Sequence, residues 1–135
     1  MILIDAGPLI AIVNADDQHH SVCVAALRAI RQPLGTVWPV LTEAMYLLAD
    51  VPGAQEAVWE IIARGAVQIL SLGTADVPRI RELMRKYSDR GMDLADAALI
   101  AVAERESIRQ FFTVDRRDFA VYRLNGKVRP VLIPL

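Results

Sequence analysis

One short stretch restricts the fold of this chain more than any other, the segment 91–104 with the sequence GMDLADAALIAVAE. Between positions 94 and 103 it holds only small and aliphatic side chains apart from Asp96. A helix that is apolar on nearly every side is a buried helix, so the pattern predicts a core helix that begins at Asp93. Asp93 and Asp96 are three positions apart and project from one face of its first turn. Because Asp is seldom buried without a partner, the pair predicts a cation or a shared proton.

Helix capping is a simpler explanation for one of these two acids. As the N-cap residue, Asp93 accepts a backbone N–H hydrogen bond, and this role alone accounts for it. Asp96 follows three positions later and gains about 0.3–1 kcal/mol from the helix dipole, but a neighbour of like charge opposes that gain. Both a structural and a functional role stay open for Asp93, whereas we predict a functional role for Asp96.

The bulk composition indicates one globular unit. The chain has 135 residues, 54% of them apolar, and we expect a single domain over residues 1–135 with one sizeable core. Cys23 is the one cysteine, and its apolar surroundings favour a place in the core over a nucleophilic role. The N-terminus lacks the basic stretch of a signal peptide, and no apolar run reaches the roughly 20 residues of a membrane span. We therefore predict a cytoplasmic protein without a membrane segment.

Charge is distributed unevenly along a chain whose net charge is only −1. Residues 1–76 carry three basic and eight acidic side chains, a net charge of −5. Residues 77–135 carry twelve basic and eight acidic side chains, a net charge of +4. A basic half beside a cluster of acids suits a polyanion bound through a metal ion, but a solvated surface of mixed charge produces the same distribution.

Five short apolar runs predict strands, and helical patterns separate them. The strands are expected at residues 1–4, 34–38, 67–70, 108–114 and 128–135. The helices are expected at residues 8–13, 19–31, 39–48, 54–63, 74–87, from 93 onward, and 116–122. Strands that alternate with helices pair in parallel, so the pattern predicts an α/β sandwich.

Acidic residues follow three of these strands. Asp5 directly follows the first strand, Asp115 the fourth, and Glu43 lies in an otherwise apolar helix after the second. In open α/β sheets ligands bind at the carboxyl ends of the strands, so Asp5 and Asp115 share a rim if their strands are neighbours. Asp93 and Asp96 open the helix before the fourth strand and reach this rim only with a favourable crossover. A lone Glu among aliphatic residues usually faces solvent, but its place after a strand end makes Glu43 a candidate.

Four acids in one pocket repel one another unless a cation neutralises them. Oxygen ligands without Cys or paired His favour Mg²⁺ or Mn²⁺ over Zn²⁺. His19 and His20 are adjacent and point in different directions on a helix, so we expect structural or surface roles for them. Mg²⁺ favours phosphate-bearing substrates, polarises a phosphodiester and lowers the pKa of a bound water. The residues themselves therefore indicate phosphodiester hydrolysis.

Four segments of the sequence, in order, resemble the PIN-domain ribonucleases, in particular the VapC-type toxins of type II toxin–antitoxin pairs. They are ILID (2–5) with LIA (9–11), TEA (42–44), DLADAALIA (93–101) and TVDRRDF (113–119). Each segment alone is a weak signature, but the four at this spacing are specific and cover nearly the whole chain. The resemblance implies a three-layer α/β/α sandwich with a central, mainly parallel sheet and an RNA-cutting enzyme that uses Mg²⁺ or Mn²⁺.

The acidic positions of that family fall on Asp5, Glu43, Asp96 and Asp115. The resemblance implies that Asp5, Asp96 and Asp115 hold the metal ion. It implies that Glu43 completes the pocket, as a ligand or by orienting the attacking water. It also implies a homodimer and a VapB-like antitoxin whose C-terminal segment covers the acidic pocket.

Three further residues of the matching segments each have two possible roles. Asp93 binds the metal through water or only caps its helix. Asp118 is a peripheral ligand or caps the next helical turn. Thr113 orients Asp115 by a hydrogen bond or simply fills its strand as a β-branched residue.

Two neighbouring arginines are candidates for holding the RNA backbone. Arg116 and Arg117 follow the last acid of the set and grip phosphates, or are only exposed to solvent. Ala6 stands where the family more often has a small polar residue, a difference that we do not expect to abolish activity. Trp38 and Trp59 lie in apolar runs, so we expect them in the core rather than stacked on bases.

Two other functions fit parts of the sequence. A phosphatase of the haloacid dehalogenase type also carries an Asp after its first strand, as Asp5 does here. Its chemistry needs a second acid two residues later, where this chain has Gly7. A non-catalytic PIN-like interaction module is the other alternative, but such a module has no need to keep mutually repelling acids.

Overall fold

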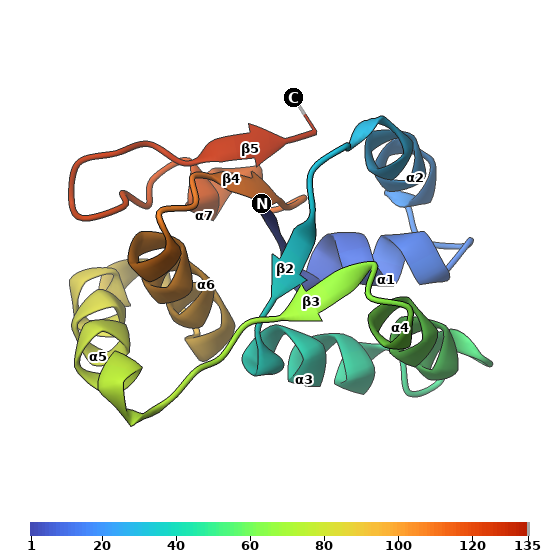
Figure 1. Cartoon of the computed structure of the whole chain (residues 1–135), viewed down its shortest axis with the longest axis horizontal. Helices are drawn as coiled ribbons and strands as arrows, with labels where there is room; N and C mark the ends of the chain where they lie inside the picture. Colours follow the sequence, from blue (N-terminus) through green and yellow to red (C-terminus); the bar gives the residue numbers. More distant parts are fainter. Residues whose placement is uncertain (135) are drawn as a thin grey trace.

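The computed structural model describes residues 1–134, which form a five-stranded sheet with helices on both faces (Figure 1). The strands are β1 (Ile2–Ile4), β2 (Leu34–Thr36), β3 (Val67–Ile69), β4 (Gln110–Phe112) and β5 (Val131–Ile133). They run in the order β3-β2-β1-β4-β5, and every pair of neighbours is parallel. The predicted α/β/α sandwich is confirmed, with a sheet that is parallel throughout these five strands.

The helices occupy the predicted segments, with ends shifted by a few residues. They are α1 (Ala6–Val13), α2 (His20–Ala29), α3 (Trp38–Leu47), α4 (Ala54–Ala63), α5 (Val77–Lys86), α6 (Leu94–Glu106) and α7 (Arg116–Phe119), with the 3₁₀ helices η1 (Thr74–Asp76) and η2 (Ser88–Arg90). The first helix begins at Ala6, two residues earlier than predicted, because Asp5 caps it directly. Among residues 1–134, no helix has the length and apolar character needed to cross a membrane.

The strand order creates a topological switch point between β1 and β4. From β1 the chain steps through α1 to α4 toward β2 and β3, and it then returns through α5 to α7 to β4 and β5 on the other side of β1. Because such crossovers are right-handed, the two groups of helices cover opposite faces. In Figure 1, α5 and α6 lie together at the left, and α2 and α4 lie at the right. The carboxyl ends of β1 and β4 are therefore where this fold accepts a ligand.

A buried framework holds the two strands that meet at the switch point. In α6 the side chains from Ala97 to Ala103 are all buried, as the apolar sequence predicts. The neighbouring strands pair in register, with Ile4 of β1 opposite Phe112 of β4, and both side chains are fully buried. Burial of each such large apolar side chain stabilises the folded state by about 1.5–3 kcal/mol. The ends of β1 and β4 are therefore held in place, and so is the backbone of the residues that follow them.

Two predictions about aromatic side chains are wrong, whereas the prediction for the cysteine is confirmed. Trp38 is 52% exposed and Trp59 is 44% exposed, so neither belongs to the core. Each lies in an apolar helix, where hydrophobic residues alone do not reveal which face turns inward.

Cys23 is fully buried in the core. The Nδ1 atom of His20 lies 2.6 Å from the carbonyl oxygen of Ala11, which ties α2 to α1.

Candidate functional site

Six carboxylates line one hollow of about 270 Å³ at the switch point between β1 and β4. They come from both halves of the chain and belong to Asp5, Glu43, Asp93, Asp96, Asp115 and Asp118. The structure thus brings together the four acids predicted as catalytic and the two predicted as auxiliary. Distant segments meet here because β1 and β4, which are far apart in the sequence, are neighbours in the sheet.

Thr113 connects the acid after β1 to the acid after β4. Its fully buried hydroxyl donates a hydrogen bond to Oδ2 of Asp5 over 3.1 Å and accepts one from the backbone N–H of Asp115 over 3.0 Å. The other carboxylate oxygen of Asp5 accepts a hydrogen bond from the backbone N–H of Ala6 at the start of α1. Thr113 therefore orients Asp115 through its backbone, and it also holds the side chain of Asp5, which the sequence did not predict.

Of the two roles predicted as possible for Asp118, the capping role belongs instead to Asp115. Asp115 is the N-cap of α7 and accepts a hydrogen bond from the backbone N–H of Asp118 over 3.2 Å. Asp118 is not a cap. Its carboxylate accepts a hydrogen bond from Nη2 of Arg90 over 3.0 Å. Asp96, Asp115 and Asp118 each place one carboxylate oxygen within 4.8 Å of the others, so the tight cluster contains Asp118 where Asp5 was expected.

The two acids at the start of α6 also have separate roles. Asp93 is the N-cap of the helix and accepts a hydrogen bond from the backbone N–H of Asp96 over 2.9 Å, while it still lines the hollow. Asp96 accepts a hydrogen bond from the hydroxyl of Tyr122 over 2.7 Å. The cap position is confirmed for Asp93, and Asp96 has a partner that the sequence analysis missed.

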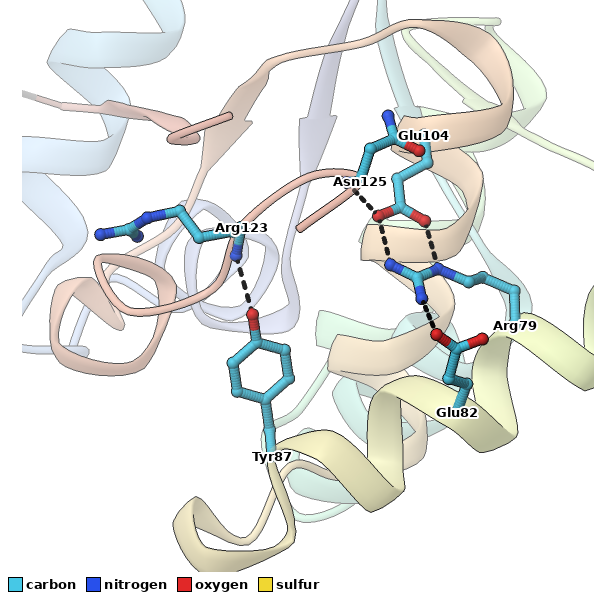
Figure 2. A network of polar contacts seen from close by, with 6 residues as sticks. All are labelled: Arg79, Glu82, Tyr87, Glu104, Arg123 and Asn125. Atoms are coloured by element: carbon cyan, nitrogen blue, oxygen red, sulfur yellow. Dashed lines mark hydrogen bonds and ion pairs between the residues drawn. The ribbon is translucent and has the colours of Figure 1, made fainter. Parts of the chain in front are cut away.

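An aromatic cluster fixes the position of Tyr122. Its ring packs edge-on against the rings of Tyr87 and Phe119, at centroid distances of 5.0 Å and 5.2 Å. The hydroxyl of Tyr87 accepts a hydrogen bond from the backbone N–H of Arg123, the residue that follows Tyr122 (Figure 2). The same figure shows Arg79 of α5 bonded to Glu104 of α6. These contacts hold α5, α6 and the chain after α7 in one arrangement behind Asp96.

Burial and crowding disfavour the charged forms of the acids. Burial raises the pKa of Asp5 to about 6, although the hydrogen bond from Thr113 acts in the opposite direction. Burial also raises the pKa of Asp96 to about 8, and the charge of nearby Asp5 adds to this against the hydrogen bond from Tyr122. A cation in the hollow removes this penalty, because an opposite charge favours the ionised carboxylate.

The pKa values of the other two predicted catalytic acids, Glu43 and Asp115, are also raised. Burial raises the pKa of Glu43 on α3, and the charges of Asp5 and Asp93 raise it further. Burial is also the main reason why the pKa of Asp115 is raised. Several perturbed carboxyl groups in one hollow are typical of a functional site.

The hollow suits a divalent cation held by oxygen ligands. Among residues 1–134, Arg90 is the one cationic side chain that donates a hydrogen bond to any of the six carboxylates. The six acids therefore leave a large excess of negative charge. Hard oxygen donors without sulfur or imidazole are the ligands of Mg²⁺ and Mn²⁺, and the carboxylate oxygens of the tight cluster provide them.

The two predicted phosphate-binding arginines begin α7 directly after Asp115, and their contacts differ. Arg116 donates a hydrogen bond to the carbonyl oxygen of Pro134 beyond β5. Arg117 is exposed and lines a second hollow beside the first. Tyr122 and Arg90 are the site residues that the sequence analysis missed. A polar hydroxyl within the otherwise apolar stretch after position 118 was the one available signal for Tyr122.

Comparison with known proteins identifies relatives along almost the whole chain. The sequence matches the PIN domain family over residues 2–124. It is 31% identical over 134 residues to Ribonuclease VapC26 of Mycobacterium tuberculosis, an alignment that covers 98% of this chain and 99% of that protein.

Solved structures share the fold at lower sequence identity. VapC20 of Mycobacterium tuberculosis, described as a sarcin-ricin loop cleaving toxin, superposes with a TM-score of 0.79 at 21% identity, over 87% of this chain and 92% of that one. A toxin–antitoxin complex from Klebsiella pneumoniae gives 0.68 at 22% identity, over 98% and 100%. VapBC2 from Rickettsia felis, bound to a promoter DNA fragment, gives 0.64 at 13% identity, over 98% and 97%.

Proposed function

This chain belongs to the PIN domain family, and we propose that it is the ribonuclease toxin of a VapBC-type toxin–antitoxin pair, a metal-dependent enzyme that hydrolyses RNA phosphodiester bonds. The sequence similarity to Ribonuclease VapC26 supports the activity. One observation carries the proposal, the meeting of six carboxylates in a single hollow at the switch point of the sheet.

The proposed ligands of Mg²⁺ or Mn²⁺ are Asp5, Asp96 and Asp115. Asp118 joins this set, because its carboxylate oxygen belongs to the tight cluster with Asp96 and Asp115. When bound, the cation stabilises the negative charge that develops on the phosphate and lowers the pKa of a nearby water. The negative charge of the same four acids repels other anions. A phosphate group therefore binds in the hollow only when a cation there neutralises the acids.

The other residues of the hollow orient the reacting groups. Glu43 of α3 lines the same hollow, and its raised pKa makes it a suitable acceptor for the proton of the attacking water. Thr113 holds the Asp5 carboxylate and the Asp115 backbone in place. Tyr122 does the same for the carboxylate of Asp96. Residues that fix acidic ligands in this way typically matter nearly as much as the ligands.

The proposed protein partner is a VapB-like antitoxin. Trp38, Tyr46 and Leu47 of α3 are exposed apolar side chains, and Leu47 also lines the acidic hollow. A peptide segment that packs against this helix therefore reaches the hollow and can cover it. Co-purification with the product of the neighbouring gene tests the pairing, and light scattering of the purified chain tests the proposed homodimer.

RNA cleavage by matched variants tests the proposed activity. We expect the wild-type protein to cut RNA in Mg²⁺ or Mn²⁺ and to be inactive in EDTA. Asp96→Asn preserves the shape of the side chain and is expected to abolish cleavage. Asp50→Asn is the matched control, because Asp50 is exposed in the turn after α3 and lies outside the hollow. Equal cleavage by all three proteins would remove Asp96 from the mechanism, whereas no cleavage by the wild-type protein in either metal would favour a non-catalytic interaction module.

A further inference from the structure

A second hollow adjoins the acidic one and differs from it in charge. It has a volume of about 420 Å³ and is lined by Asp89, Arg90, Arg117 and Asp118. Asp118 lines both hollows, so the two share a wall. Asp89 is exposed to solvent, and Asp118 already accepts a hydrogen bond from Arg90. The cationic groups that remain are Arg117 and the rest of the Arg90 guanidinium.

Arg90 is held at this shared wall with part of its guanidinium unpartnered. Its Nη2 donates to Oδ1 of Asp118 over 3.0 Å and lies 3.5 Å from the carbonyl oxygen of Arg117. Its Nε is buried and has no hydrogen-bond partner among residues 1–134. A buried donor without an acceptor costs stability. Nη1 of the same guanidinium also makes no hydrogen bond among residues 1–134 but is not buried, so an oxygen atom of a ligand in the second hollow can reach it.

The local backbone fixes Arg90 close to the carboxylates. Arg90 ends η2, and Gly91 follows with a φ of 69°, a left-handed conformation that Gly adopts without strain. Gly91 itself lines the acidic hollow, and Asp93, the cap of α6, comes two residues later. The turn that delivers the acids of α6 to the hollow therefore also places Arg90 at its edge.

We propose that Arg90, together with Arg117, binds a phosphate of the RNA strand next to the phosphate that is cleaved. This inference rests on the proposed ribonuclease function. Consecutive phosphates of one strand need consecutive sites, and the two arginines of a hollow that shares a wall with the acidic one provide the second. The planar guanidinium of Arg matches two phosphate oxygens at once, whereas a carboxylate pair alone repels them.

A purely structural role for Arg90 makes a different prediction. The Arg90–Asp118 ion pair also links η2 to α7. If Arg90 served only to link these two helices, its loss would lower the thermal stability of the protein without changing the salt dependence of RNA binding. Each phosphate contact to a single strand contributes about −0.7 to the slope of log K against log salt, so the slope separates the two roles.

The experiment measures RNA binding in variants that cannot cleave. In an Asp96→Asn background, binding of a short fluorescent single-stranded RNA is titrated at several salt concentrations. Arg90→Gln is expected to reduce the magnitude of the slope by about 0.7. Arg90→Lys keeps the charge and is expected to keep the slope while it weakens binding. Arg109→Gln is the matched control, since exposed Arg109 precedes β4, at the end of that strand away from the acidic hollow, and should leave the slope unchanged.

An unchanged slope in Arg90→Gln, or no RNA binding by the Asp96→Asn parent, overturns the inference. Circular dichroism melts check that each variant is folded. Arg117→Gln leaves the Arg90–Asp118 ion pair in place and should also reduce the slope by about 0.7, so it covers the case in which Arg90→Gln unfolds. Cleavage by the wild-type protein is scored separately. RNA cleavage with no effect of Arg90 contradicts only this inference, whereas a slope that depends on Arg90 without cleavage contradicts only the proposed activity.

Discussion

The hydroxyl of Tyr122 donates a 2.7 Å hydrogen bond to the carboxylate of Asp96, although the two residues are 26 positions apart in the chain. Tyr122 is fully buried between the rings of Tyr87 and Phe119. A buried tyrosine that uses its one hydroxyl on an acid of the hollow fixes the direction of that acid. The contact joins the aromatic core to the proposed chemistry, and it leads to the first prediction.

Tyr122→Phe is expected to lower metal affinity and RNA cleavage by about 10–100-fold, the usual cost of removing a partner of a metal ligand. The ring remains, so the aromatic packing should survive. Isothermal titration with Mn²⁺ measures the affinity, and Tyr46→Phe is the control because Tyr46 is exposed on α3. Unchanged metal affinity in the Tyr122 variant would mean that the hydroxyl serves folding alone.

Thr113→Val is expected to destabilise the protein by about 1–3 kcal/mol, because it leaves one buried and one partly buried polar group without a partner. Those groups are the carboxylate of Asp5 and the backbone N–H of Asp115. Thr113→Ser keeps the hydroxyl and should retain more activity than the Val variant. Urea unfolding and RNA cleavage measure both effects. If Val were as active as Ser, the hydroxyl would not be what positions Asp5.

The stability of the metal-free protein is expected to fall as the pH rises. The pKa values of Asp5 and Asp96 in the folded chain are about 6 and about 8, above the ordinary value of 3.8. The folded state therefore binds these protons more tightly than the unfolded state. The resulting stabilisation is complete below the ordinary pKa and is lost as the pH rises through 6 and then 8.

Thermal unfolding in EDTA measures this pH dependence. Asp96→Asn should remove the loss near pH 8, and saturating Mg²⁺ should reduce the whole slope by stabilising the ionised carboxylates. A melting temperature that stays constant or rises over this pH range would contradict the assignment of raised pKa values to these two acids.

Gly7→Ala is expected to cost about 1–3 kcal/mol through overpacking. A Cβ at Gly7 comes within 2.6 Å of Cγ2 of Val114, and both residues line the acidic hollow. Val114→Ala removes the obstructing methyl group, so the double variant should recover part of the lost stability. A double-mutant cycle measures this coupling, and strictly additive effects would show that the two positions do not contact each other.

Glu104→Gln is expected to destabilise the contact between α5 and α6 by about 1–3 kcal/mol. Glu104 is nearly buried and accepts hydrogen bonds from Nε and Nη2 of Arg79 and from the backbone N–H of Asn125 (Figure 2). Glu82 pairs with the same Arg79 but is 69% exposed, so Glu82→Gln should cost at most about 1 kcal/mol. Equal losses in the two variants by chemical unfolding would contradict this ranking.

Acid stability offers a second test of Glu104. Burial raises its pKa, but the hydrogen bonds from Arg79 and Asn125 outweigh this, and the net pKa is below the ordinary value of 4.5. Glu104 therefore contributes stability above pH 4.5 that is lost as the pH falls through its lowered pKa. The Gln variant should lose less stability than the wild type on acidification.

The location of most acids follows from local sequence patterns. Asp5 follows an apolar strand, and Asp93 precedes an apolar helix. The predicted ends of these two elements therefore give the positions of both residues. Parallel β structure then brings strand ends to one rim. That β1 pairs with β4 is a property of the tertiary structure, which local patterns do not encode. This pairing brings Asp115 to the same rim as Asp5.

The partners of the acids depend on contacts that no local pattern encodes. Tyr122 bonds to Asp96 only because the chain turns back after α7. Arg90 reaches Asp118 from a separate 3₁₀ helix, 28 positions away. Trp38 lies in an apolar run and is nevertheless exposed, because apolar composition does not tell which side of a short helix faces a neighbour.

The hydrogen bond between Thr113 and Asp5 spans 108 positions of the chain, and this has a consequence during protein synthesis. Asp5 leaves the ribosome early, and the residues after β4 leave it late. β1 therefore cannot pair with β4 until most of the polypeptide has emerged. A nascent chain of this kind has no assembled acidic hollow. Any ligand that needs both Asp5 and Asp115 can therefore bind only when synthesis of the chain is nearly complete.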